Sequence, residues 1–412
     1  MTLLYPLLLM LLMNGFPEWN ARSLADRQKI VVSGWATSEE EQKELQARIS
    51  QFNASQDQIL ATYEPIPLTD YYNESIISGF RSGLSADIFY VRDADLPLFI
   101  SHGGVLNLNR FLERGTPGKS DFHQPALDAF RLPGNQYFAI PKDFNYIGLV
   151  VNETWREACG LSAGGPATLD DLAIWFEKMS SSGFKQNTHV GALVFRGHDF
   201  EVFPLVVSLY GNRPLQPFEP SEVIGPSLTY FSWWAVNKWM LPEYNVREST
   251  NYFARQQAGS VIEGIWFFPY LTQNFPDLRF RIYPFPAAEA GQPPVLILTT
   301  VGWGIWSGTK HPEAAWKVLT FLVSDFSYDR WLKESVAYPP MTSQINQIIR
   351  GKESRSGARE LLTVPARRVP LSTWSSADIN VLSKEVRTML LFRKYPGDSR
   401  ETVEHLLNRG AR

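Results

Sequence analysis

The sequence is short of the residues on which many kinds of site depend. It has one cysteine, Cys159, which excludes an intrachain disulfide and any metal site built from several cysteines. Its six histidines are scattered, and the closest pair, His189 and His198, has no cysteine or carboxylate at ligand spacing. We therefore predict no metal site and no cofactor.

Familiar catalytic motifs are also missing. The sequence contains no G-x-S-x-G, H-E-x-x-H, Walker A or G-x-G-x-x-G pattern, and these are the arrangements that place a nucleophile, a metal-bound water or a phosphate. The balance of 39 basic and 42 acidic residues gives a formal net charge of -3, which provides no general attraction to nucleic acid. These absences favour a protein that is not an enzyme and does not bind nucleic acid.

One apolar run stands near the N-terminus, at residues 3–13. It is too short to span a bilayer and has the length of a signal-peptide core, although no basic residues precede it. No cysteine follows the run, which excludes the usual lipoprotein anchor. We therefore predict a leader over residues 1–23 and an exported protein, periplasmic or extracellular, that is not a lipoprotein.

The remaining chain is rich enough in apolar residues for two domains, because 44% of its 412 residues are hydrophobic. Strand patterns at 29–35, 61–66 and 86–91 alternate with helix patterns, which is typical of an open parallel α/β sheet. In such sheets ligands bind beyond the carboxyl ends of the strands. Trp35, Arg92 and Asp93 stand at such ends.

The most informative stretch is residues 298–322, LTTVGWGIWSGTKHPEAAWKVLTFL. An apolar, β-branched run ends in a Gly302-Trp303-Gly304 step, and Pro312 suits the first turn of the helix that follows. Backbone N–H groups beside one flat apolar face would suit a small polar ligand with a carbon skeleton, such as a sugar. An ordinary buried strand with a core tryptophan fits the same residues.

This stretch resembles the late-chain signature of the maltose-binding-like extracellular solute-binding proteins of ABC importers, a Gly-Trp-Gly-type step followed by Ser-x-x-Lys-x-Pro-Glu-Ala-Ala-Trp. Other blocks resemble the same family in the same order, and together the six blocks cover nearly all of residues 28 to 345. Besides residues 298–322, the blocks are the crossover with Tyr137, Pro141 and Asn152, the helix start at 166–172, the Gly-x-Trp block at 253–271 with Trp266, the strand at 280–286, and the crossover at 337–340.

The resemblance implies an α/β fold of two lobes joined by three crossovers, with the ligand in a cleft between the lobes. The first lobe would comprise residues 28–141 and 302–336, and the second residues 145–298 and 341–412. A hinge movement would close the lobes around the ligand and present the closed form to an ABC transporter permease. The resemblance further implies a monomer that binds a small molecule, with a sugar or oligosaccharide as the expected ligand.

Candidate ligand-binding residues follow from this map, since sugars are held by aromatic faces and by planar polar groups. For each aromatic side chain, core packing is the alternative. For Glu39 the alternative is a helix-cap carboxylate, and for Arg92 and Asp93 a mutual ion pair. The aromatic candidates are Trp35, Phe144, Trp266 and Trp303, with Tyr338 and Trp374 as weaker ones; the polar candidates are Glu39, Arg92, Asp93 and Asn145, and Gly302 would offer a backbone N–H.

Two rival functions are compatible with the same residues. A glycoside hydrolase would also combine tryptophans with carboxylates, but it needs a carboxyl pair about 5–5.5 Å apart or about 6.5–9.5 Å apart. Asp87, Asp93, Asp143 and Glu263 are the available carboxylates, and nothing in the sequence pairs them. A binding protein that serves a sensor instead of an importer is the other rival.

Overall fold

The computed structural model describes residues 27–35, 39–67, 72–181, 191–211, 220–242, 251–324, 337–350, 356–370 and 376–392. The predicted leader at 1–23 and the weaker candidate Trp374 lie outside these residues. Within the described residues, no helix is long and apolar enough to cross a membrane.

The described strands form one ten-stranded mixed sheet in the order β2-β1-β3-β11-β6-β9-β7-β8, with β10 paired to β6 and β12 paired to β11. Its strands are β1 (Gln28–Gly34), β2 (Ile59–Pro65), β3 (Ile88–Arg92), β6 (Ala139–Asn152), β7 (Gly191–Phe195), β8 (Met240–Pro242), β9 (Ala258–Gly264), β10 (Phe280–Tyr283), β11 (Val295–Ile305) and β12 (Arg367–Pro370). A separate hairpin joins β4 (Arg131–Leu132) to β5 (Gln136–Tyr137). The prediction of an α/β fold is confirmed.

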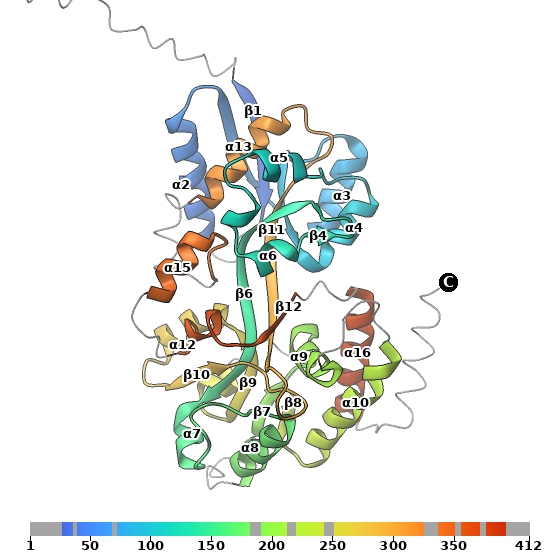
Figure 1. Cartoon of the computed structure of the whole chain (residues 1–412), viewed down its shortest axis with the longest axis vertical. Helices are drawn as coiled ribbons and strands as arrows, with labels where there is room; N and C mark the ends of the chain where they lie inside the picture. Colours follow the sequence, from blue (N-terminus) through green and yellow to red (C-terminus); the bar gives the residue numbers. More distant parts are fainter. Residues whose placement is uncertain are drawn as a thin grey trace, which may run out of the picture.

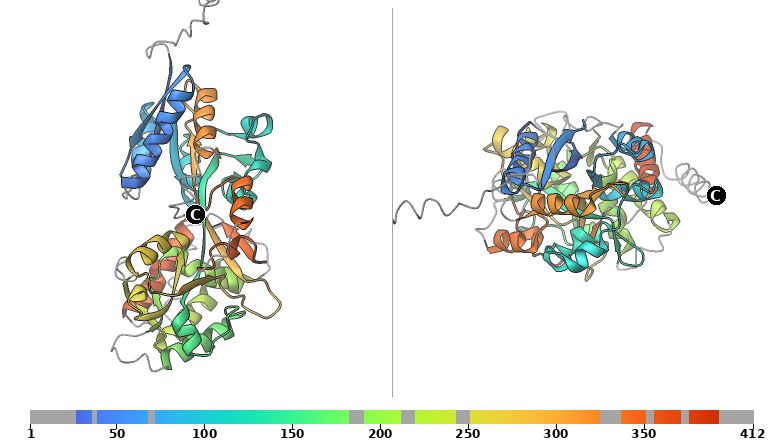
Figure 2. Two further views of the ribbon diagram at one scale, coloured as in Figure 1. Left: turned by 90° about the vertical axis from the view of Figure 1, so that its left-hand side faces the viewer. Right: turned by 90° about the horizontal axis from the view of Figure 1, so that it is seen from above.

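The elements gather into an upper and a lower group, which β6 and β11 join (Figures 1 and 2). In the upper group, β1 pairs in parallel with both β2 and β3, as the strand–helix alternation predicts. The helices of this group are α2 (Glu39–Ser55), α3 (Tyr72–Ser82), α4 (Leu96–Ser101), α5 (Asn109–Arg114), α6 (Gln124–Asp128) and α13 (Pro312–Val323), with the short 3-10 turns η1 (Asp93–Asp95) and η2 (Lys119–Asp121). Leu45, Ile49 and Phe52 form the buried stripe of α2, because their spacing places them on one helical face.

In the lower group, β7 pairs in parallel with both β8 and β9, so a second parallel sheet segment is built like the first. The other elements are α7 (Glu153–Ala158), α8 (Leu169–Ser181), α9 (Asp199–Tyr210), α10 (Pro220–Val236), α12 (Phe268–Asn274) and α16 (Ser376–Phe392), with the 3-10 turns η3 (Ile265–Phe267) and η4 (Glu360–Leu362). Helix α15 (Thr342–Arg350) lies between the two groups and contacts η2 of the upper one and η4 of the lower one. Figure 1 shows α9 and α12, which follow β7 and β9, on the side of the lower group that faces the upper one.

Buried apolar side chains collect in three clusters. One consists of residues 30–140 and 303–323 and forms the core of the upper group. A second, within residues 147–390, fills the lower group. The third lies mainly within residues 144–362 and also includes Ala126 of α6 and Ala129, which directly follows that helix. The upper and lower groups therefore have cores of their own, and α6 contributes to both sides.

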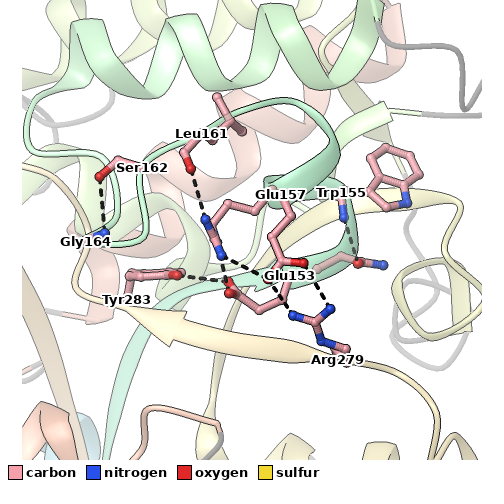
Figure 3. Close-up of polar contacts among 10 residues, drawn as sticks. Glu153, Trp155, Glu157, Leu161, Ser162, Gly164, Arg279 and Tyr283 are labelled. Atoms are coloured by element: carbon pink, nitrogen blue, oxygen red, sulfur yellow. Dashed lines mark hydrogen bonds and ion pairs between the residues drawn. The ribbon is translucent and has the colours of Figure 1, made fainter.

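The far end of the lower group is tied together by ion pairs around α7 (Figure 3). Asn152 begins this helix by accepting a hydrogen bond from the backbone N–H of Trp155 at 3.2 Å. Arg156 contacts Glu153 at 2.9 Å, and the Tyr283 hydroxyl donates to the same carboxylate at 2.8 Å. Arg279 reaches Glu157 across the surface at 2.5 Å. These side chains satisfy one another, which indicates a structural role in docking α7 onto β10.

Candidate functional site

The carboxyl ends of the parallel strands meet head to head in the middle of the sheet. β3 ends at Arg92 opposite Val301 of β11, and Val301 pairs with Asp143 of β6. From the other direction, β9 ends at Gly264, which pairs with Ile147 of β6. Four residue steps at ~3.3 Å each separate these ends by about 13 Å along β6. We call β6 residues 143–147, with β11 residues 299–301, the waist.

The waist contains an irregularity that redirects one side chain. Val301 pairs with Asp143, but Gly302 pairs with Pro141, so Lys142 is the extra residue of a β-bulge. Lys142 Nζ lies 3.3 Å from Glu41 of α2, contacts the Asp143 carboxylate, and sits 5.3 Å above the Tyr90 ring. Burial raises the pKa of Asp143, and the Lys142 ammonium opposes that effect.

Trp266 stands at the end of β9, on the lower side of the waist. A Cβ added to Gly264 would lie 2.1 Å from Cζ3 of the Trp266 ring, so the indole packs directly against the glycine backbone. Only glycine permits this approach. The indole is half-buried, while the residues on either side of it, Ile265 and Phe267, are buried. Trp266 therefore offers a supported aromatic face at the strand ends.

Three buried ionisable side chains form a connected group that includes Glu263, near the end of β9, and we call Arg196, Glu201 and Glu263 the buried triad. Arg196 Nε lies 2.7 Å from Glu201 Oε1, and Arg196 Nη2 lies 2.7 Å from Glu263 Oε2. Glu263 also accepts a hydrogen bond from the backbone N–H of Gly264 at 3.2 Å. Burial raises the pKa of both carboxyl groups, and the Arg196 guanidinium opposes this rise.

The other predicted aromatic faces are covered by protein. Trp35 packs edge-on against Tyr72 and Tyr90, and the Trp303 ring lies 4.3 Å from the Tyr90 ring. The exposed fractions are 7% for Trp35 and 2% for Trp303. The cavity beside Trp303 and Lys142 has a volume of about 20 Å³, enough for about one water molecule. In this conformation the core-packing alternative accounts for both tryptophans.

Phe144 and Tyr338 form part of the connection between the two groups. Their backbones exchange hydrogen bonds of 3.0 and 2.8 Å, and both side chains are buried. Phe144 also stacks on His123, with ring centroids 4.6 Å apart. Gly302 is likewise closed off, since a Cβ there would lie 2.5 Å from the Phe130 ring. The structure thus gives these three residues packing contacts where ligand contacts were predicted.

Among the polar candidates, some have partners within the protein and one does not accept a hydrogen bond from the described residues. The alternative considered for Arg92 and Asp93, an ion pair with each other, does not form: the exposed Arg92 pairs with Asp95, three residues along, and Asp93 is buried at the start of η1. Glu39 begins α2, is exposed, and pairs with Lys43 at 3.4 Å. Asn145 lies at the centre of the waist, half-buried, and its amide oxygen accepts no hydrogen bond from the described residues.

Residues 35–325 match the family model described as bacterial extracellular solute-binding protein. The chain belongs to this family. The match covers the whole of β3, β6, β7, β9 and β11, and therefore the waist and the strand ends on both sides of it. No curated protein matches the sequence.

Several solved structures share the fold of this solute-binding protein. An ABC substrate-binding protein of Listeria monocytogenes in complex with cycloalternan superposes with a TM-score of 0.74 at 15% identity, covering 94% of this chain and 99% of that one. The GacH receptor of Streptomyces glaucescens, solved unliganded and with acarbose, gives 0.72 at 16% identity over 93% and 98%. A binding protein of Bacillus subtilis in an open conformation gives 0.75 at 12% identity over 95% and 100%.

Family membership confirms the prediction of a binding protein over an enzyme, and the carboxylates agree with it. Asp87 lies before β3, at the end of that strand remote from the waist, and accepts from the Val31 backbone N–H at 2.9 Å. Asp143 contacts Lys142, and Glu263 belongs to the buried triad. Among the described residues there is also no group of three potential metal ligands. The hydrolase alternative therefore has no support in this solute-binding protein.

Sequence reasoning missed Lys142, Glu41 and the triad members Arg196 and Glu201. Glu41 and Lys142 are 101 residues apart, and Arg196 and Glu263 are 67 residues apart. A local signal existed for Glu201, whose carboxylate accepts from the His198 backbone N–H at 3.0 Å as a helix-start acid should. The others show no pattern in their own neighbourhoods, because the fold alone brings them together.

A larger groove of about 800 Å³ lies elsewhere, on the outer flank between the end of α2, α13 and α15. Its lining includes Phe52, Asp121, Lys317 and Thr342 and shares no residue with the strand ends. The head-to-head strand ends carry the stronger argument for the solute site, since they combine the half-buried indole of Trp266 with the amide oxygen of Asn145, which accepts no hydrogen bond from the described residues.

Proposed function

We propose that this solute-binding protein captures a small carbohydrate at the waist and delivers it to an ABC importer. The observation that carries the proposal is the Trp266 indole, held against Gly264 where the strand ends of the two groups face each other. An indole face covers the C–H face of a pyranose, and the Asn145 amide can pair with its hydroxyls. The Listeria and Streptomyces neighbours bind cycloalternan and acarbose, both carbohydrates.

The mechanism is hinged closure of two lobes, residues 28–141 with 302–336 and residues 145–298 with 341–412. Two separate cores joined by β6 and β11 support this division. A ligand that touches both sides of the waist stabilises the closed form, and it can shift the equilibrium only by its greater affinity for that form. The closed form would then dock on a membrane permease as a monomer.

Export completes the proposal. The family is described as extracellular, and the predicted leader at residues 1–23 would direct the protein across the membrane and then be removed. The absence of a cysteine after the leader is evidence against a lipid anchor. Mass spectrometry of the protein from a secreting host would show a new N-terminus close to residue 24 if the leader is cleaved.

A thermal-shift screen tests the carbohydrate claim. Maltotriose, maltotetraose, acarbose and D-tagatose are each added to the purified protein, together with amino acids and polyols as non-sugar solutes. A ligand at ~100 times its Kd adds about 2.7 kcal/mol to the free energy of unfolding and raises the melting temperature. The proposal expects a sugar hit that is recovered chemically unchanged. A shift produced by an amino acid or polyol alone would refute the carbohydrate claim.

Trp266→Ala tests the site. We expect cooperative unfolding to persist, because the indole is half-buried and at the end of its strand, whereas sugar affinity should fall at least about tenfold. Ile174→Ala is a matched control, since Ile174 is 53% exposed on α8 and should leave affinity unchanged. Wild-type affinity in Trp266→Ala would remove Trp266 from the site.

A further inference from the structure

The pairing of β6 with β11 and with β9 decides which side chains share a face of the waist (Figure 1). Asn145 of β6 lies opposite Thr299 of β11, and Ile147 of β6 lies opposite Gly264 of β9. Side chains of directly opposite residues project from the same face of a sheet, and so do those of residues two apart along one strand. Asn145, Thr299 and Ile147 therefore project from one face, which we call the Asn145 face.

The Trp266 ring lies over the Asn145 face as well. A Cβ added to Gly264 would project to the same side as Ile147, its partner in the ladder, and it would lie 2.1 Å from the Trp266 ring. Two residue steps along β6 separate Ile147 from Asn145, which is about 7 Å. The aromatic ring and the polar side chains of Asn145 and Thr299 thus stand on one face, within the span of a small carbohydrate.

The opposite face of the waist is closed by protein. Phe144 and Thr300 project from it, and their exposed fractions are 0% and 3%. His123 stacks on Phe144, and the Thr300 hydroxyl donates to a backbone carbonyl of β6 at 2.5 Å. Asn145 and Thr299, by contrast, are both half-buried. A ligand therefore reaches these two strands from the Asn145 face.

Thr299 brings a hydroxyl to a strand that is apolar up to this point. Residues 295–298, VLIL, are all buried, and valine would serve the strand as well as threonine, since both are β-branched. The hydroxyl can donate and accept a hydrogen bond, and the Asn145 amide oxygen accepts none from the described residues. Directly opposite Cβ atoms are about 4.5–5.5 Å apart, so the two groups can bind hydroxyls on adjacent carbons of one ring.

We infer that Thr299 is a ligand-binding residue that determines specificity: with Asn145 it binds two neighbouring hydroxyls of a carbohydrate whose ring stacks on Trp266. The inference rests on the proposed carbohydrate site at the waist. It gives a role to a residue that is not among the candidates predicted from the sequence. It also narrows the ligand to sugars that present a pair of adjacent hydroxyls beside the stacked ring.

Thr299→Val tests the hydroxyl, because it removes one polar atom and keeps a β-branched side chain. The probe is whichever of maltotriose, maltotetraose, acarbose and D-tagatose binds the wild-type protein, and Kd is measured by calorimetry. The inference expects about tenfold weaker binding, through the loss of one hydrogen bond to the ligand. Wild-type affinity in Thr299→Val would refute it.

Thr300→Val is the matched control, since the next residue of β11 carries the same side chain on the closed face. This variant loses the hydrogen bond to the β6 carbonyl and should melt at a lower temperature, but its sugar affinity should match that of wild type. Equally weakened binding in both variants would show that either hydroxyl acts through the β6–β11 ladder and not through the ligand, which contradicts the inference.

Deoxy derivatives of the bound sugar identify the hydroxyl that Thr299 binds. Each derivative lacks one hydroxyl, and its Kd is measured with wild type and with Thr299→Val. At one position the derivative should bind wild type about tenfold more weakly than the parent sugar does, yet show no further loss in Thr299→Val, because that partner is already gone. The same cycle with Asn145→Ala should single out the adjacent carbon. Additive losses at every position, or two positions that are not adjacent, would overturn the inference.

The remaining outcomes are also decisive. If Thr299→Val does not unfold cooperatively, Thr299→Ser and Thr299→Ala decide: the serine variant keeps the hydroxyl and should bind like wild type, the alanine variant should bind about tenfold more weakly, and equal affinity of the two refutes the inference. If the wild-type protein binds a sugar that Thr299→Val binds equally well, the inference fails and the proposed function stands. If the wild-type protein binds none of the four sugars, the proposed function is contradicted, and the inference falls with it.

Discussion

Protonation of His123 should destabilise the connection between the two groups, and the resulting loss in the free energy of unfolding can be worked out from the structure. His123 stacks on Phe144 with an interplanar angle of 11°, and its Nε2 lies 3.0 Å from the Tyr146 hydroxyl. Burial, together with the nearby Arg368 guanidinium, lowers the pKa of His123 from 6.5 to about 4. Neither cause exists in the unfolded chain, where the pKa returns to its ordinary value.

The sign follows from which state binds the proton more readily. Between pH 6.5 and pH 4 the unfolded chain is protonated at His123 while the folded protein is not, so the free energy of unfolding falls as the pH falls. At ~1.36 kcal/mol per pKa unit, the difference between 6.5 and about 4 amounts to about 3 kcal/mol. This contribution is fully present above pH 6.5 and is lost as the pH falls to 4.

Chemical denaturation at pH 7, 6, 5 and 4 measures the effect, with His123→Gln as the variant that cannot titrate. Carboxyl groups also titrate in this range, and the raised pKa values of Glu201 and Glu263 act with the opposite sign. They are common to both proteins and cancel in the difference. Wild type should lose about 3 kcal/mol more than His123→Gln between pH 7 and 4.

Tyr146→Phe is the matched control, because it perturbs the same cluster but leaves burial and Arg368 in place. It should lower stability by about 1 kcal/mol through the lost hydrogen bond, with the same pH dependence as wild type. Parallel curves for wild type and His123→Gln would refute the reasoning, since they would mean that His123 titrates alike in the folded and unfolded states.

Three further outcomes follow from packing and charge. Gly264→Ala would place a Cβ 2.1 Å from the Trp266 ring. Calorimetry should therefore show at least about tenfold weaker sugar binding, and denaturation should show a loss of about 1–3 kcal/mol in the free energy of unfolding. In the control Gly164→Ala the nearest atom would be 3.6 Å from the new Cβ, so neither quantity should change. Trp303→Ala should cost about 3–5 kcal/mol in denaturation experiments, because the ring is 2% exposed, and a loss below 1 kcal/mol would contradict its core role. Arg196→Gln leaves two carboxylates buried without their guanidinium and should cost about 3–5 kcal/mol. Arg279→Gln removes an exposed ion pair with Glu157 and should cost less than about 1 kcal/mol. Equal losses of stability in the two variants would contradict the role given to burial.

The fold was predictable because its determinants are local. The stripe of Leu45, Ile49 and Phe52 specifies α2, and the β-branched run before Gly302 specifies β11. The position of Trp266 could also be predicted, since a Gly-x-Trp sequence after an apolar strand places the ring at the strand end. Each of these features depends on residues within a few positions of one another.

The site was less predictable because contacts between distant strands decide which face of a side chain is free. Trp303 and Trp266 look alike in sequence, as aromatic residues beside glycines at strand ends. Trp303, however, lies within β11 and meets Tyr90 of the neighbouring β3, whereas Trp266 lies beyond the end of β9 and has Gly264 beneath it. The ring that covers Trp303 belongs to a residue more than 200 positions away in the sequence, and no pattern near Trp303 predicts this contact.

The burial of Phe144 suits a hinge better than it suits a binding surface. β6 and β11 cross the waist side by side, and their ladder is interrupted there by the bulge at Lys142, which is where a paired ribbon bends most easily. The ladder ends of β3 and β9 leave residues 143–147 paired mainly to β11 and to Tyr338. Phe144, stacked on His123 and tilted against Tyr338 at 5.2 Å, is therefore packed between these two rings at the middle of this segment. Asn145, next along the strand, points to the opposite face of the ladder, so a bend of β6 at Phe144 would reposition its amide oxygen, which accepts no hydrogen bond from any described residue.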